Sequence, residues 1–277
     1  MTISAFLGDL STYIRSVLWI GIAVASSYTH TADITFLSAS PFDEDIKSEE
    51  FKTTNVGHLL MDKILSDSKY SQEFKSMPTL RVHQAISQDT YPNWVFLAAE
   101  FSTYITFPDL AEKYDKSEVL FQLQCAIISK RSNKTSFYAL DKDSNARLAV
   151  IAHKSEVDLA VDFFGIPIKL TTVKSYSNGI KMLLAERVDY LAMTVEGFGI
   201  AAAAAQIDKD LFTLSECSDE LSVGLLYYID KNMEPELKAF IESGVKKAIR
   251  DGTIQKLYDD FYGPYKADLD VVPYPQP

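Results

Sequence analysis

His153 and Glu196 are the residues of this chain whose side chains could act together as an acid and a base. General acid–base catalysis needs both groups placed around one substrate, and no spacing in the sequence ties these two to each other. His58 and His83 resemble ordinary helix residues. The chain contains no G-x-S-x-G nucleophile, Walker loop, H-E-x-x-H or dinucleotide glycine fingerprint, and no cysteine–histidine spacing typical of zinc. We therefore predict a protein that is not an enzyme and uses neither a cofactor nor a metal ion.

The net charge limits the partners of this protein. The chain has a formal net charge of −11, so nucleic acid and anionic membranes would repel it at long range. With 277 residues and 47% hydrophobic content, it can form one large domain or two smaller ones with packed cores. Composition therefore predicts a globular protein that does not bind nucleic acid.

An apolar run near the N-terminus is typical of a secretory signal. Residues 17–25 (VLWIGIAVA) follow Arg15 and end in an A-x-A cleavage site, although Asp9 cancels the charge of Arg15. A run of about ten apolar residues is too short to span a bilayer as a helix, and no later segment is long and apolar enough to do so. We predict a signal peptide over 1–25 and a periplasmic or secreted protein. A cut nearer Ala32, a mis-assigned start or an uncleaved anchor are the alternatives.

Strands alternate with helices along the rest of the chain. The predicted strands are 33–38, 94–98, 119–129, 148–152, 168–173, 190–193 and 222–230. The predicted helices are 56–65, 80–87, 157–164, 178–185 and an alanine-rich helix from Ile200. Such alternation predicts an α/β fold with parallel sheets covered by helices on both faces.

Residues 235–263 read as two amphipathic helices. Their apolar side chains recur at three- and four-residue intervals, and Lys and Arg side chains gather where the first helix ends. Gly252 can take the left-handed conformation that ends this helix, and Thr253 can cap the second. Gly263 and Pro264 are expected to end the second helix. Both helices must pack on a core.

Two motifs resemble a known family. The first is D-G-T followed by I-x-K-L-Y-D-D-F-Y-G near the C-terminus, and the second is SYSNGIKMLLAERVDYLAMT at 175–194. Both are similar to the amino-acid-binding type of extracellular solute-binding proteins, family three. The resemblance is good over 147–263 and weak before that range.

The resemblance implies a two-lobed, type II periplasmic-binding-protein-like α/β fold, with two hinge crossovers near Ile128 and Val223. The implied domains are 1–25 signal peptide, 26–128 first part of lobe 1, 129–221 lobe 2, 222–263 C-terminal part of lobe 1, and 264–277 polar tail. It also implies a monomer that captures a small ligand between the lobes and passes it to the permease of an ABC transporter, or signals to a membrane sensor, through hinge closure.

Both charges that recognise an α-amino acid in this family are missing here. Family members carry a T-x-x-x-R run whose arginine binds the ligand carboxylate, but 99–110 (AEFSTYITFPDL) contains no arginine. The family's carboxylate for the ligand's amino group closes the strand after R-V-D, and Thr194 stands there instead. We therefore expect a small polar or aromatic ligand that is not a standard amino acid.

The resemblance assigns ten candidate ligand contacts, each with a structural alternative. Phe42 matches the first-lobe aromatic residue or packs in the core, Arg81 precedes a helix or is simply solvated, and Glu196 faces the cleft or favours a helix N-terminus. Three stand where the family's arginine loop would lie: Glu100, Ser102 and Tyr104. Three stand in a turn that offers backbone amides, His153, Lys154 and Ser155, and Thr194 stands at the end of the R-V-D strand.

Cys125 and Cys217 are the two cysteines of the chain. An exported protein could pair them, but each lies in a run where a buried free thiol is equally natural. The resemblance places each beside a crossover strand, in a register too distant for an easy bridge. We predict free thiols.

Two other functions stay open on the sequence. A degenerate cleft would make the protein a binding module that acts through a membrane sensor or another partner. A dehydratase-like enzyme on the same fold would need an acid and a base such as His153 and Glu196 in the cleft. The first function predicts no tight small ligand, whereas a transport receptor predicts saturable binding and lobe closure.

Overall fold

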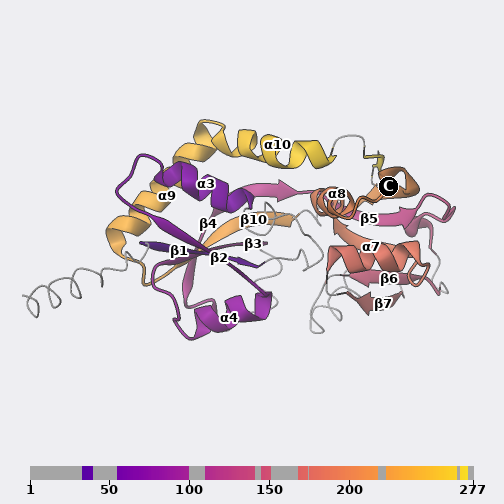
Figure 1. Ribbon diagram of the computed structural model, residues 1–277, viewed down its shortest axis with the longest axis horizontal. Helices are drawn as coiled ribbons and strands as arrows, with labels where there is room; N and C mark the ends of the chain where they lie inside the picture. The colour runs from indigo at the N-terminus through magenta and orange to yellow at the C-terminus, as the bar shows by residue number, and fades with distance from the viewer. Residues whose placement is uncertain are drawn as a thin grey trace, which may run out of the picture. The chain divides into compact units, whose positions relative to one another are not determined.

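The chain contains two mixed β-sheets flanked by helices (Figure 1). The computed structural model describes residues 33–39, 55–99, 110–140, 145–150, 168–173, 175–217, 223–266 and 269–273. Within these residues, 34–277 form one compact unit. The predicted signal peptide lies outside the described residues.

The first sheet has the strand order β2-β1-β3-β10-β4. Its strands are β1 (Ile34–Ala39), β2 (Gln72–Met77), β3 (Trp94–Ala99), β4 (Tyr114–Leu123) and β10 (Val223–Asp230). β1 runs parallel to β2 and β3, whereas β10 runs antiparallel to β3 and β4. Residues 34–38 of β1 are all buried, as expected for a strand covered on both faces.

Helices cover both faces of the first sheet. They are α3 (Val56–Leu65), α4 (Thr79–Ser87), α9 (Pro235–Arg250) and α10 (Thr253–Lys266). α3, α9 and α10 lie on one face and α4 on the other (Figure 1). Alternate side chains of β1 face the two sides of the sheet, because Phe36 belongs to the same core as Leu237 of α9 and Leu257 of α10, while Leu37 belongs to the same core as Val82 of α4.

The second sheet has the order β11-β9-β5-β8-β6-β7. Its strands are β5 (Cys125–Lys130), β6 (Arg147–Val150), β7 (Lys169–Thr172), β8 (Tyr190–Thr194), β9 (Phe212–Glu216) and β11 (Val271–Val272). The helices of this part are α7 (Tyr176–Leu184) and α8 (Val195–Ala204), with short 3-10 turns at Phe137–Ala139 and Lys209–Leu211. Ile180, Leu191, Phe198 and Phe212 contribute to its core.

The sheets are mixed, so the prediction of parallel sheets is wrong. β10 is antiparallel to its neighbours in the first sheet, and β5 is antiparallel to β8 and β9 in the second. β4 and β9 end where the chain changes sheet, whereas β5 and β10 begin there. An outgoing strand and a returning strand that lie side by side therefore run antiparallel.

The apolar run predicted as one strand at 119–129 is two strands in two sheets. β4 ends at Leu123 and pairs with β10, whereas β5 begins at Cys125 and pairs with β8 and β9. Ile128 lies within β5, so the chain changes sheet at Gln124, a few residues before the crossover expected near Ile128. Apolar residues lie on both sides of Gln124, and the period of a sequence cannot show that a strand changes its pairing partner.

Some of the other predicted helices and strands agree with the structure and some do not. The helices at 56–65 and 80–87 and the positive φ of Gly252, 76°, agree with the structure. β2 and β9 have no counterpart in the prediction, because their alternating half-polar sequences give little apolar signal. The alanine-rich helix begins at Val195 rather than Ile200.

The C-terminal part is not a plain polar tail. α10 continues through Pro264 to Lys266, since a proline in the last turn removes only one helical hydrogen bond. Val271 and Val272 then pair with β9 of the second sheet. Among the described residues, no helix combines the length and apolar character needed to cross a membrane.

Candidate functional site

Three of the ten predicted contact residues fall within the described part of the chain: Arg81, Thr194 and Glu196. The other seven lie outside it, and their ligand contacts stay predictions. They are Phe42, Glu100, Ser102, Tyr104, His153, Lys154 and Ser155.

Arg81 lies in the first turn of α4, and its side chain is exposed. α4 follows β2, which is parallel to β1, so its N-terminus lies at the carboxyl edge of that pair. Ligands of open α/β sheets bind at such edges. The position of Arg81 is thus compatible with a ligand contact and also with a solvated helix residue.

Thr194 ends β8 and caps α8. Its Oγ1 atom accepts a hydrogen bond from the Gly197 backbone N–H at 3.0 Å, which satisfies one of the free amides of the first helical turn. Tyr176 packs beside it, and burial raises the pKa of Tyr176 to about 12, against the opposing effect of its hydrogen bond to Thr194. The end of this strand therefore carries neutral hydroxyl groups.

Glu196 is a buried carboxylate with several donors. Its side chain is 1% exposed. Oε2 accepts from the Gln124 backbone N–H at 3.1 Å, and Oε1 accepts from the Tyr258 hydroxyl and from Lys266 Nζ at 3.1 Å. Lys266 Nζ also lies 3.0 Å from the Tyr258 hydroxyl oxygen. Burial and then the hydrogen bond to Glu196 raise the pKa of Tyr258, which keeps the phenol protonated as the donor.

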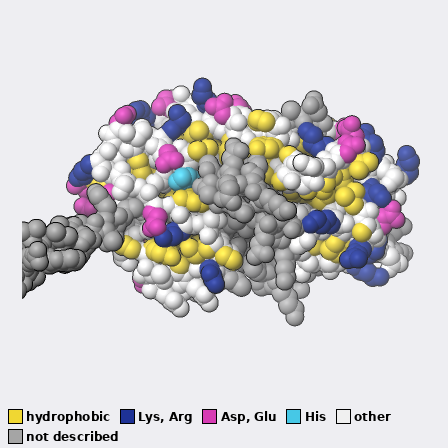
Figure 2. All heavy atoms as spheres, viewed as in Figure 1, with side chains coloured by type: hydrophobic (Ala, Val, Ile, Leu, Met, Phe, Trp, Pro, Cys, Tyr) yellow, Lys and Arg dark blue, Asp and Glu magenta, His cyan; other side chains and the backbone are white. Residues whose placement is uncertain are grey.

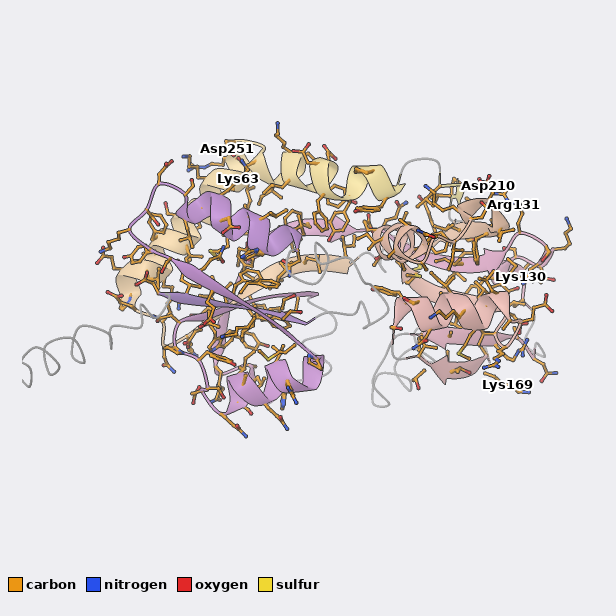
Figure 3. The ribbon with its side chains drawn as sticks, viewed as in Figure 1. Lys63, Lys130, Arg131, Lys169, Asp210 and Asp251 are labelled. Carbon is orange, nitrogen blue, oxygen red and sulfur yellow. A yellow bond between two sulfur atoms is a disulfide. The ribbon has the colours of Figure 1, made fainter. Side chains whose placement is uncertain are left out.

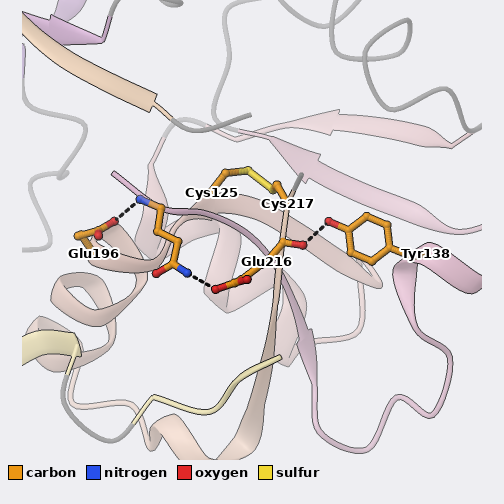
Figure 4. Close-up of a disulfide and its surroundings, with 6 residues drawn as sticks. Cys125, Tyr138, Glu196, Glu216 and Cys217 are labelled. Atoms are coloured by element: carbon orange, nitrogen blue, oxygen red, sulfur yellow. Dashed lines mark hydrogen bonds between the residues drawn. A yellow bond between two sulfur atoms is a disulfide. The ribbon is translucent and has the colours of Figure 1, made fainter. Parts of the chain in front are cut away.

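Gln124 is the residue on which the chain passes from the first sheet to the second. Its carbonyl accepts from Val195 N–H at 2.8 Å, and its side-chain amide donates to Glu216 Oε1 at the end of β9 (Figure 4). Tyr138 donates a hydrogen bond to the carbonyl of Glu216 at 2.6 Å. The bond from Gln124 to Glu216 joins the outgoing crossover to the strand that precedes the return crossover.

Cys125 and Cys217 form a disulfide at the same place, so the prediction of free thiols is wrong (Figure 4). β5 and β9 are antiparallel neighbours in which Ala126 lies opposite Glu216. This register puts the two cysteines opposite each other, with Cα atoms 5.3 Å apart, a separation suited to a disulfide.

Sequence reasoning missed Gln124, Glu216, Tyr258 and Lys266 as members of one cluster. Only weak signals pointed to them: a glutamine inside an apolar run and a glutamate next to a cysteine. Their proximity depends on strand pairing and on the end of α10, and neither has a pattern in the sequence.

A separate cavity of about 740 Å³ lies at the opposite edge of the second sheet. It is lined by residues at the beginning of β6 and β8, including Arg147 and Tyr190, and by Lys130 at the end of β5. Arg147 pairs with Asp189 at 2.8 Å, and Lys130 pairs with Glu186 at 2.6 Å. The cavity is therefore at the edge away from Thr194, with its charges paired within the protein.

On the coloured part of the face seen in Figure 2, Lys and Arg side chains are interspersed with Asp and Glu. Within the described ranges, no group of three or more His, Cys, Asp or Glu side chains is placed to hold a metal ion.

Comparison with known proteins gives matches in structure at low sequence identity. No family model matches this chain, and no curated protein matches its sequence. The arginine-, lysine-, histidine-binding protein ArtJ from Geobacillus stearothermophilus is 15% identical, with a TM-score of 0.62, covering 83% of this chain and 95% of that one. An ancestral amino acid-binding protein, a precursor of cyclohexadienyl dehydratase, is 17% identical, with a TM-score of 0.60, covering 83% and 96%.

A third match is the substrate binding protein of an amino acid ABC transporter, 14% identical, with a TM-score of 0.60, covering 83% of this chain and 99% of that one. At these identities the matches establish the fold. The chain has the two-lobed α/β fold of type II periplasmic binding proteins, as the sequence predicts.

Proposed function

We propose that this protein is an exported solute-binding protein that captures a small ligand between its two lobes and delivers it to a membrane permease. The observation that carries the proposal is the pair of adjacent crossovers. The chain leaves the first sheet after Leu123 of β4 and returns to it at Val223 of β10, and these two strands are neighbours. In the second sheet the crossovers lead into β5 and out of β9, which are also neighbours. Neighbouring crossovers form a hinge, and hinge closure around a ligand needs no chemistry. Solved proteins of this fold include a substrate binding protein of an ABC transporter.

Export is supported by two independent features. The apolar run 17–25 suits a signal peptide, and the Cys125–Cys217 disulfide suits an oxidising compartment such as the periplasm. We therefore propose that the mature protein acts in the periplasm or outside the cell.

The proposed ligand is small, polar or aromatic, and not a standard amino acid. Thr194 offers a hydroxyl where an ammonium would need a carboxylate, and that hydroxyl already caps α8. Glu196, two residues later, is enclosed by its own donors. We propose the remaining predicted contacts, such as Phe42 and His153, as lining residues, and we propose no catalytic role for any of them.

A thermal-shift screen tests the ligand class. The protein from Ser26 onward is mixed with amino acids, organic acids, sugars, nucleobases and aromatic metabolites. A ligand at 100 times its dissociation constant stabilises the fold by about 2.7 kcal/mol. A hit outside the amino acids is expected, and a strong shift with an ordinary amino acid would overturn the ligand class. A screen without any hit would favour the degenerate binding module that acts through a sensor.

A variant pair tests the position of Thr194. Thr194→Asp keeps a good helix cap but adds a charge where we expect the ligand. It should abolish the shift from a neutral ligand. Thr172→Asp, on the exposed end of β7, is the matched control and should leave the shift unchanged. If Thr194→Asp keeps the same ligand-induced shift as Thr172→Asp, Thr194 does not belong to the ligand site.

A further inference from the structure

We infer that α10 together with residues 269–273, the C-terminal strap, forms a third connection between the two lobes and limits the hinge, with Glu196 as the pin that holds the strap. This inference concerns the mechanics of the fold and rests on the proposed hinge motion. Its test needs no ligand, so it can fail while solute binding stands.

The strap begins on the first lobe. Ile254 and Leu257 of α10 are buried in the core that contains α3 and α9. The helix then extends to α8, which follows β8 of the second sheet. There the backbones meet closely, because a Cβ atom added at Gly199 would overlap the Tyr265 carbonyl. One helix therefore contacts both lobes.

The strap ends in the second sheet. After α10, Leu214 N–H donates to the carbonyl of Asp270 at 3.3 Å, and Val271 and Val272 pair with β9. Asp270 also forms an ion pair with Arg131 at 3.1 Å. The chain thus crosses from one lobe to the other once more, beyond the two crossovers of the hinge.

Glu196 links this third connection to the hinge itself. One of its oxygens accepts from the backbone of Gln124 in the first crossover, and the other accepts from Tyr258 and Lys266 of the strap. A buried carboxylate is retained only where donors compensate its loss of water. Opening that separated α8 from α10 would leave this carboxylate without two of its donors, which opposes the motion.

The disulfide and the amide of Gln124 complete the junction. Cys125–Cys217 joins the outgoing crossover to the strand before the return crossover, and Gln124 Nε2 donates to Glu216 beside it. The two crossovers are therefore tied to each other, and the strap is tied to the first of them. The two crossovers must therefore move together when the lobes open or close.

The test measures the separation of the lobes without ligand. Spin labels are carried by unnatural amino acids at Lys63 on α3 and Lys169 on β7, two exposed positions (Figure 3), so that the disulfide is untouched. Double electron–electron resonance gives the distribution of separations. Lys266→Met should broaden the distribution or shift it to longer separations. Lys256→Met, on an exposed position of the same helix, is the matched control and should match the parent.

Hydrogen exchange provides a second measurement at the pin. In Glu196→Gln and Tyr258→Phe, the amide of Gln124 should exchange roughly tenfold faster or more, because the strap no longer holds its acceptor. Unchanged distances and unchanged exchange in variants that unfold cooperatively would overturn the inference. A loss of thermal stability with unchanged distances would do so too, since it would show packing without control of the hinge.

Discussion

Asp189 and Glu196 are carboxylates of the same lobe with different surroundings. The Asp189 side chain is 34% exposed and faces one guanidinium, whereas Glu196 is 1% exposed and accepts from three donors in two segments, the crossover at Gln124 and α10. Water screens the ion pair of Asp189 with Arg147, so this pair contributes little to stability beyond its own surroundings. Burial makes Glu196 depend on every donor it has. Charge alone therefore does not tell which carboxylate matters to the fold.

Asp189→Asn should lower stability in a pH-dependent way. The hydrogen bonds from Arg147 lower the pKa of Asp189, so its contribution is present above the usual carboxyl pKa of about 3.9 and is lost as pH falls through the lowered value. At pH 7 we expect a loss of about 1 kcal/mol, because partial exposure screens the pair. Urea unfolding at pH 7 and near pH 2.5 measures the difference, which should shrink at the lower pH.

Asp67→Asn is the control for this prediction. Asp67 is exposed just after α3, and its substitution should leave the urea midpoint nearly unchanged at both pH values. A loss in Asp189→Asn that is the same at both pH values would contradict an ionic origin.

At the scale of elements, β5 and β9 decide where the lobes are joined. Both strands are short. β5 begins at the hinge with Cys125, and β9 ends there, directly before Cys217. The bond closes a segment with a sequence separation of 92. A cross-link over so long a segment restricts the unfolded chain strongly.

The double variant Cys125→Ser/Cys217→Ser should therefore be less stable by about 2–4 kcal/mol. Urea unfolding of the parent with and without reductant should show the same difference, which separates loss of the bond from effects of the substitution. The double variant itself should not respond to reductant. Alkylation of the unreduced, denatured parent should label no cysteine, and labelling of both would show that the disulfide does not form.

At the scale of the whole molecule, the second lobe is built almost entirely from one continuous segment. Five of its strands lie between Cys125 and Glu216, and β11 alone comes from the strap. Its core is separate from the cores of the first lobe, although Ile200 of α8 packs with the first. The segment begins and ends at neighbouring points, as in a domain inserted into another.

The fragment 124–217 should fold alone when its disulfide is formed. We expect native-like circular dichroism and cooperative urea unfolding, at a lower midpoint than the whole chain, because the α8 surface around Glu196 and Ile200 loses α10. Reduction should unfold it more readily than the parent. A fragment without a cooperative transition would show that the second lobe depends on the strap.

Sequence patterns predicted most elements because burial imposes a period on helices and strands. The stripes of α9 and α10, the cap position at Gly252 and the helix at 56–65 follow from this rule. The fold class followed from the alternation of elements and from two motifs. Half-polar strands such as β2 and β9 escaped because one face contributes too few apolar residues.

The sequence by itself determined the α/β class and the amphipathic C-terminal helices, since these depend on residue types and local spacing. Only the tertiary structure decided that Gln124 divides an apolar run, that Cys125 meets Cys217, and that Glu196 holds the strap. Those features depend on which strands pair and where a helix ends. Contacts between residues 92 positions apart, such as Cys125 and Cys217, produce no periodic pattern in the sequence.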